Sequence, residues 1–167
     1  MKKKLLSLIL VAAFILGSVF VQPVEMKAAS TSLYGSVEEK KGVYYLTDGK
    51  NQEGTVTYNK KINTEDTTIT FKYYLKNCKG SDGAANGIQV IFTPDKIKET
   101  LLIGKSNAGR EGAYAVEFDT CHSGGKDPKY EHIGVIHEDA LNHLNEVKSN
   151  KIADGKWHTA KIKVTSE

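Results

Sequence analysis

The sequence predicts an all-β protein in which two sheets pack face to face as a sandwich. Apolar and polar residues alternate with a period of two in several short segments, and glycine-containing turns separate these segments. In residues 68–75, Ile69, Phe71, Tyr73 and Leu75 share one face, and threonine and lysine side chains lie opposite. Many short strands joined by tight turns are typical of a sandwich.

The expected strands follow one another along the chain, and turn-favouring residues bound them. They are expected at residues 42–46, 54–58, 68–75, 87–92, 115–119, 133–136 and 158–164. The turn signals include Asp48-Gly49, Asn86-Gly87, Gly124-Gly125 and Asp154-Gly155. The segment 138–151 is ambiguous because its leucines and Val147 have helical spacing, and we expect a short helix or a loop there.

Residues 1–29 have the layout of a signal peptide. Lysines follow Met1, an uncharged apolar run extends from Leu5 to Val21, and Ala28-Ala29-Ser30 provides a suitable cleavage site. We therefore expect one domain at residues 30–167, secreted or attached to the cell surface or wall, without membrane contact after cleavage. The alternative is that the apolar run is retained as a membrane anchor.

The predicted leader also carries the excess positive charge of the chain. Four lysines and one glutamate in residues 1–29 account for the formal net charge of +3, so the remaining residues are close to neutral. Binding of nucleic acid depends on a basic surplus or a basic stripe, and this domain has neither. We exclude nucleic acid as a partner.

The expected domain is short for its fold class. A complete sandwich of this kind often needs about 200–250 residues, and the last apolar alternation stops directly before Thr165-Ser166-Glu167. A strand at that point normally leads into a hairpin. We therefore expect the sandwich to be incomplete, with strands missing at its carboxyl end.

The segment 115–120 contains the residues best suited to binding an ion. Glu117 and Asp119 share a face on a strand, where two carboxylates repel each other unless a cation, a basic group or a shared proton intervenes. Asp127 and His132 follow shortly after them. Carboxylates suit calcium, and an added imidazole suits manganese or a similar transition ion. The alternative is a pair of solvated carboxylates at a sheet edge.

These residues resemble the metal-binding segment of the L-type lectins, the legume-lectin family, which also includes domains of bacterial surface proteins. The resemblance lies in Glu117-Phe118-Asp119-Thr120, Asp127-Pro128 and His132-Ile133-Gly134-Val135, and it extends to Ala85-Asn86-Gly87-Ile88, Phe92-Thr93-Pro94 and Asp154-Gly155-Lys156-Trp157-His158. It implies a concanavalin-like jelly-roll β-sandwich that binds carbohydrate. The expected partners are glycans.

Carried over residue by residue, the resemblance implies two metal ions. Manganese or a similar transition metal would be held by Glu117, Asp119, Asp127 and His132. Calcium would share Asp119 and Asp127 and would also take the backbone carbonyl of Cys121. In the family an asparagine completes the calcium shell, and the matching residue in this chain is Ser123.

The resemblance also implies a carbohydrate-binding loop at Asn86 and Gly87, which Ser123 would approach. The family has an aspartate where this chain has Asn86, and an amide accepts hydrogen bonds through one oxygen only. Asp82 lies close enough in the sequence to supply a replacement carboxylate.

The chain has two cysteines, Cys78 and Cys121, and thiols of an exported protein tend to pair. A disulfide would close a loop of about 43 residues and stabilise the fold by about 3–4 kcal/mol. Two separate buried thiols are the alternative. The resemblance favours the disulfide, because it brings the sugar loop and the calcium loop together.

Two other functions remain open beside a lectin. Some glycoside hydrolases share the jelly roll, but they need an acid and a second carboxylate. The glutamate expected shortly after Asp119 is absent, because Thr120, Cys121 and His122 follow. We therefore expect a non-enzyme. A structural or adhesive surface module without sugar binding is the other alternative, which the changes at Asn86 and Ser123 would permit.

Overall fold

The computed structural model describes residues 6–10, 30–49, 52–76, 87–94, 111–122, 127–138 and 143–165. Within these ranges the chain forms twelve β-strands and no α-helix. Accordingly, this part of the chain has no helix with the length and hydropathy needed to cross a membrane. The prediction of an all-β protein is confirmed.

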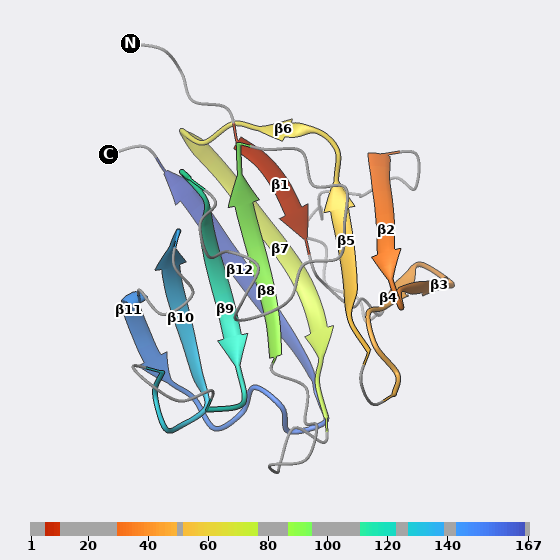
Figure 1. Cartoon of the computed structure of the whole chain (residues 1–167), viewed down its shortest axis with the longest axis vertical. Helices are drawn as coiled ribbons and strands as arrows, with labels where there is room; N and C mark the ends of the chain where they lie inside the picture. Colours follow the sequence, from red (N-terminus) through yellow and green to blue (C-terminus); the bar gives the residue numbers. More distant parts are fainter. Residues whose placement is uncertain are drawn as a thin grey trace.

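The larger sheet has six strands in the order β11-β10-β9-β8-β1-β6, and every neighbouring pair is antiparallel (Figure 1). Its strands are β11 (His143–Lys148), β10 (His132–His137), β9 (Tyr114–Asp119), β8 (Gly87–Thr93), β1 (Leu6–Leu10) and β6 (Lys61–Ile62). The antiparallel order places consecutive strands β8 to β11 side by side. Residues at the end of β9 and the start of β10 therefore lie at one end of the sheet.

A second layer consists of β7 (Asp66–Tyr74) and β12 (Trp157–Thr165), which pair antiparallel along their whole length. Figure 1 shows these two strands crossing behind β8 and β9. The Phe118 ring of β9 lies 5.9 Å from the Phe71 ring and 4.9 Å from the Tyr73 ring, measured between centroids. Because the two sheets bury their apolar faces against each other, the molecule is a sandwich.

Two strand pairs complete the described part of the chain. β2 (Thr31–Gly35) pairs with β5 (Gly54–Tyr58), and β3 (Glu38–Lys40) pairs with β4 (Val43–Tyr45). Figure 1 shows both pairs on the side of the molecule away from β11. They are thus remote from the residues predicted to bind metal.

The alternation of residues predicted most of these strands, but the interpretation of residues 138–151 was wrong. A strand, β11, occupies His143–Lys148 in place of a helix or loop. Its apolar residues do not form the buried stripe of a helix, since Leu144 is 57% exposed and Val147 is also exposed. Pairing with β10 satisfies the backbone groups along one side of this edge strand, and local helical spacing did not reveal that pairing.

Strand β1 comes from the predicted leader. It lies between β8 and β6, with Leu8 opposite Phe92 and Leu6 opposite Ile62. The removal of residues 1–29 stays a prediction. If it occurs, the main-chain groups of β8 that face β1 lose this partner, and an open strand edge is prone to pair with another chain.

Candidate metal centre

The two carboxylates of β9 lie on the face of the larger sheet opposite to Phe118. The strand register sets Glu117 beside Gln89 of β8 and Asp119 beside His132 of β10, so residues of three strands converge on this face. Glu117 is 4% exposed, Asp119 8% and His132 1%. The alternative of solvated carboxylates at a sheet edge is excluded, because both side chains are buried on a central strand.

Glu117 is the centre of the hydrogen-bond network. Its Oε2 accepts a hydrogen bond from the side-chain amide of Gln89 at 3.1 Å. Its Oε1 lies 3.3 Å from Nε2 of His132 and 2.5 Å from Nε2 of His143. All ion pairs of Glu117 within the described ranges involve imidazoles, so no lysine or arginine there neutralises this buried carboxylate.

The backbone orients the imidazole of His132. Its Nδ1 lies 3.1 Å from the carbonyl oxygen of Tyr130, and a carbonyl can only accept a hydrogen bond. Nδ1 therefore carries the proton, and in the neutral ring Nε2 presents a lone pair toward Glu117. A histidine that binds metal is commonly held in this way, by a hydrogen bond from its other nitrogen to a carbonyl.

Asp119 is held at the end of β9. Its Oδ1 accepts a hydrogen bond from the backbone N–H of Cys121 at 2.7 Å. Burial raises the pKa of Asp119 to about 6, the Cys121 N–H acts in the opposite direction, and the negative charges of Asp127 and Glu117 add to the increase. Burial of the carboxylate is thus the main cause of the raised pKa, and the neighbouring carboxylates add to it.

Asp127 joins the same cluster from the segment before β10. It is buried, and its carboxylate oxygen lies with ligand atoms of Asp119 and His132 within 4.8 Å of one another. Of the four residues predicted to hold a transition metal, Asp119, Asp127 and His132 form one such group, and Glu117 joins His132 and His143 in a second group that shares His132. Carboxylate oxygens and imidazole nitrogens suit calcium and transition ions, so this donor set fits a divalent cation.

Gly87, predicted to bind sugar, begins β8 directly beside the cluster. Its register partner is Asp119, its φ is +120°, and a Cβ at this position would lie 2.0 Å from the carbonyl oxygen of Phe118. Only glycine tolerates both conditions. The predicted sugar loop therefore enters the sheet next to the candidate metal residues.

Four of the predicted site residues lie outside the described ranges: Asp82, Asn86, Ser123 and the half-cystine candidate Cys78. The thiol of Cys121 is free among the described residues, and the disulfide stays a prediction because Cys78 is not described. The assignments of Asn86 and Asp82 to sugar, and of Ser123 to calcium and sugar, also stay predictions.

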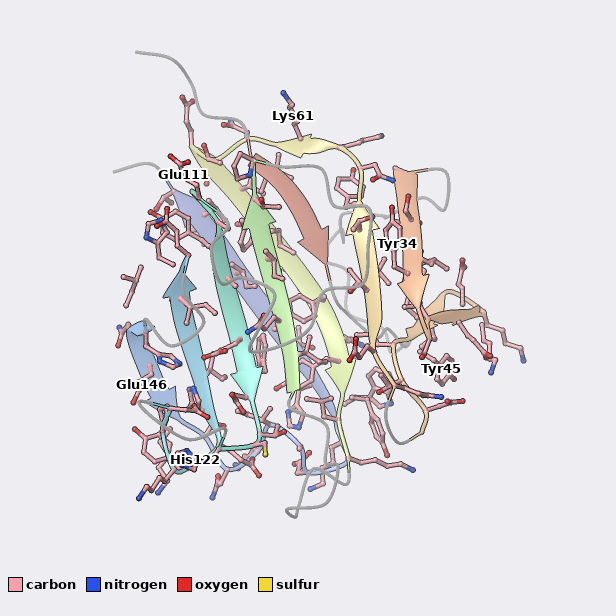
Figure 2. The ribbon with its side chains drawn as sticks, viewed as in Figure 1. Tyr34, Tyr45, Lys61, Glu111, His122 and Glu146 are labelled. Carbon is pink, nitrogen blue, oxygen red and sulfur yellow. The ribbon has the colours of Figure 1, made fainter. Side chains whose placement is uncertain are left out.

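Sequence reasoning missed two histidines near the cluster. His143 of β11 contacts Glu117, and it forms a possible ligand group with Glu117 and His132. His122 lies 3.8 Å from Asp127 on the solvent side, measured from Nδ1 to Oδ2. Figure 2 shows His122 at the end of the sheet where β9 finishes, and Glu146 on the outer strand that carries His143. Even recognition of β11 as a strand beside β10 would not have indicated His143, because its direction depends on a shift in register between Val135 and Ile136.

Comparison with known proteins supports the fold. No protein-family model matches the sequence, and no curated protein matches it. Among solved structures, the metal-free form of lectin I-B4 from Griffonia simplicifolia matches with a TM-score of 0.65 and 22% identity, over 84% of this chain and 70% of that chain. The chain therefore has the concanavalin-like jelly-roll fold of the legume lectins.

Proposed function

We propose that this chain is a carbohydrate-binding domain of the lectin type, with a divalent metal beside its glycan site. The observation that carries the proposal is the position of the buried cluster in a legume-lectin fold. Glu117, Asp119 and His132 meet directly beside Gly87, at the start of the strand that follows the predicted sugar loop. A lectin recognises sugars through loops at such a site.

The chain's own residues explain why a metal would matter. Several carboxylates are buried within one cluster, and burial, together with the negative charges of Asp127 and Glu117, raises the pKa of Asp119. A divalent cation would neutralise these charges when bound. The backbone at Cys121, which is tied to Asp119 by its N–H, would then be held in a fixed position. Calcium together with manganese or a similar transition metal is the proposed pair.

In this proposal the sugar is bound without chemical change. Asn86 and Gly87 would meet sugar hydroxyls from the loop before β8, and Ser123 would approach from the loop after β9. Affinity for a single sugar would be modest, so presentation of several copies would strengthen attachment. The leader-like residues 1–29 support export, and we propose that the domain acts in a secreted or wall-attached protein of a bacterial surface.

One sequence observation favours a second candidate, a structural or adhesive module that binds metal but no sugar. The two positions at which this chain departs from the lectin pattern, Asn86 and Ser123, are both predicted to contact sugar. An enzyme is not proposed, since the chain lacks the second glutamate that a related hydrolase would use.

The test begins with thermal unfolding of the full chain in EDTA, followed by unfolding after addition of calcium and manganese. Ion binding to the native state must raise the melting temperature. The same protein is then applied to a glycan array, with and without EDTA. We expect a reversible metal-dependent rise and glycan binding that EDTA abolishes.

The two measurements separate the candidates. A rise in melting temperature without binding to any glycan would support the adhesive module. A folded chain whose melting temperature does not change with metal would refute the metal centre. Release of reducing sugar from polysaccharides would refute the assignment as a non-enzyme.

A further inference from the structure

We propose that His143 of β11 is a metal ligand, and that the second imidazole shifts the site from manganese toward zinc and similar ions. The proposal rests on the metal centre of the proposed function. It adds a ligand to the set that the lectin resemblance implies, which consists of Glu117, Asp119, Asp127 and His132. Three features of the sheet bring His143 to Glu117 and His132 of this set.

The first feature is an irregularity in the pairing of β10 with β11. Val135 pairs with Asn145, but the next residue, Ile136, pairs with His143, so the register shifts between Val135 and Ile136. The shift leaves Leu144 without a register partner on β10. A regular ladder would have put Leu144 opposite Ile136 and turned His143 to the other face of the sheet, because side chains alternate.

This bulge therefore decides which side chain meets the cluster. Ile136 pairs with Ala115 of β9, two residues before Glu117, so His143 is set on the face that carries Glu117. The His143 side chain is only 10% exposed, whereas Leu144 points largely to solvent. The bulge thus exposes the apolar Leu144 and buries the imidazole of His143. Bulges often re-aim a side chain at a functional site.

The second feature is the absence of a side chain at Gly134. Gly134 lies on β10 directly between Glu117 of β9 and β11. A Cβ at this position would lie 2.8 Å from Cδ2 of His143 and 3.0 Å from Oε1 of Glu117. The imidazole thus passes over β10 through the space that glycine leaves open. A Cβ here would force the His143 ring or the Glu117 carboxylate to shift.

The third feature is the convergence of three lone-pair atoms. Nε2 of His143 lies 3.1 Å from Nε2 of His132 and 2.5 Å from Oε1 of Glu117, and the remaining distance is 3.3 Å. Ligand atoms bound at about 2.0–2.2 Å to one zinc ion at tetrahedral angles are about 3.3–3.6 Å apart. A small outward movement of the His143 ring would give that spacing.

When both rings are neutral, a single N–H is available to these three atoms, so a further proton or a cation is needed to balance them. The Tyr130 carbonyl fixes the proton of His132 on Nδ1, so its Nε2 can only accept. One N–H on His143 can serve either Glu117 or His132, which leaves an acceptor facing an acceptor. A divalent cation would accept electron pairs from all three atoms at once, which is the arrangement of a two-histidine, one-carboxylate metal site.

The added imidazole changes which metal the site prefers. Manganese and calcium favour oxygen ligands, while imidazole nitrogen suits zinc, nickel and copper. The second imidazole beside His132 and Glu117 would therefore increase the affinity for zinc more than the affinity for manganese. His143 should contribute little to the binding of calcium, which would rely on the oxygen ligands Asp119 and Asp127.

The experiment is calorimetric titration of the metal-free full chain with zinc alone and with manganese alone, using a competing chelator where binding is tight. The wild type is compared with His143→Ala and with the size-matched His143→Gln. His137→Ala is the control, because His137 stacks on Tyr114 with ring centroids 4.2 Å apart, at the far end of β10. Cobalt is added to each protein as a spectroscopic probe of its ligands.

We expect both His143 variants to lose zinc affinity by about tenfold or more, since even residues that only orient a ligand cost 10–100-fold. Manganese affinity should fall several-fold less, and the visible absorption of bound cobalt should change only in the His143 variants. Equal zinc affinity and unchanged cobalt spectra in wild type and both variants would overturn the proposal, while metal binding itself would still stand. A wild-type chain that binds none of these ions would refute the metal centre as well.

Discussion

Two regions of the molecule pair carboxylates with histidines, and they balance charge in different ways. At the start of β12, Nε2 of His158 lies 2.7 Å from Oδ1 of Asp154, and the imidazole stacks on Tyr73. The backbone N–H of Lys156 donates to the same oxygen at 3.0 Å. One carboxylate thus meets one imidazole at a partly exposed position. This region requires no additional cation to balance its charge.

The cluster at the ends of β9 and β10 has no such balance. Glu117 and Asp119 are buried on one face, with Asp127 beside them, and the imidazoles of His132 and His143 both contact Glu117. The comparison teaches that proximity of acid and histidine does not by itself indicate a metal site. The indication comes from burial together with an excess of acceptors, because a buried charge requires compensation. Metal should therefore act on one region and leave the other unchanged.

The largest expected effect comes from Glu117→Gln compared with His158→Asn. Metal at about 100 times its dissociation constant should stabilise the wild type by about 2.7 kcal/mol, a rise in melting temperature of roughly 5–10 °C. Glu117→Gln removes a charged ligand and should lose most of this rise. His158→Asn should keep it, although its melting temperature without metal should fall slightly.

Thermal unfolding of the three proteins, each with EDTA and with added metal, checks this prediction. If His158→Asn lost the metal response to the same extent as Glu117→Gln, the contrast between the two regions would be wrong. Circular dichroism before heating establishes that each variant retains its β-structure.

A smaller effect is expected from Gly134→Ala, which closes the space between Glu117 and β11 while His143 itself remains. The added Cβ must displace the imidazole, so zinc affinity should fall by about tenfold. Manganese affinity should fall less, provided that Glu117 keeps its position. Titration with both ions measures the effect, and Gly112→Ala is a suitable control because a Cβ there would meet only Pro94, at 3.8 Å, although its positive φ adds strain. Unchanged zinc affinity in Gly134→Ala would contradict a role for this gap.

Much of the fold was predictable because it follows from local alternation. Ile69, Phe71 and Tyr73 lie on the buried face of β7, as their spacing predicts. The shared face of Glu117 and Asp119 was predictable for the same reason, and the lectin resemblance placed Asp127 and His132 with them. Burial of these residues on a central strand was not contained in their spacing, because it depends on which strands pair beside β9.

The role of His143 was not predictable for a further reason. Its direction depends on the bulge opposite Val135 and Ile136, and a bulge is a property of the paired strands rather than of either sequence alone. Leu144 and Val147 suggested a buried helical face, yet both are exposed at the edge of the sheet. The sequence shows Gly134 within the lectin-like segment. That its missing side chain leaves room for an imidazole becomes apparent only when the neighbouring strands are in place.

The smallest predicted effect is a pH dependence that should distinguish the two regions in the metal-free protein. Burial raises the pKa of Asp119 from an ordinary value of 3.8 to about 6, so the folded chain holds a proton that the unfolded chain releases. The resulting stability is fully present below pH 3.8 and is lost as the pH rises through about 6. The metal-free chain should therefore be more stable at about pH 5 than at about pH 7.5, by about 1 kcal/mol after allowance for solvent screening.

Asp154 provides the opposite case. The hydrogen bond with His158 lowers the pKa of Asp154 below its ordinary value of 3.8, so its contribution is lost only as the pH falls through that lower pKa. Between about pH 5 and about pH 7.5, Asp119→Asn should remove part of the pH dependence, whereas the carboxyl of Asp154 stays ionised over this range and contributes none. Chemical denaturation in EDTA at both pH values measures the two slopes. If Asp119→Asn retained the wild-type slope, the raised pKa inferred for the buried Asp119 carboxyl would be wrong, and one physical reason for a cation at Glu117 and Asp119 would be lost.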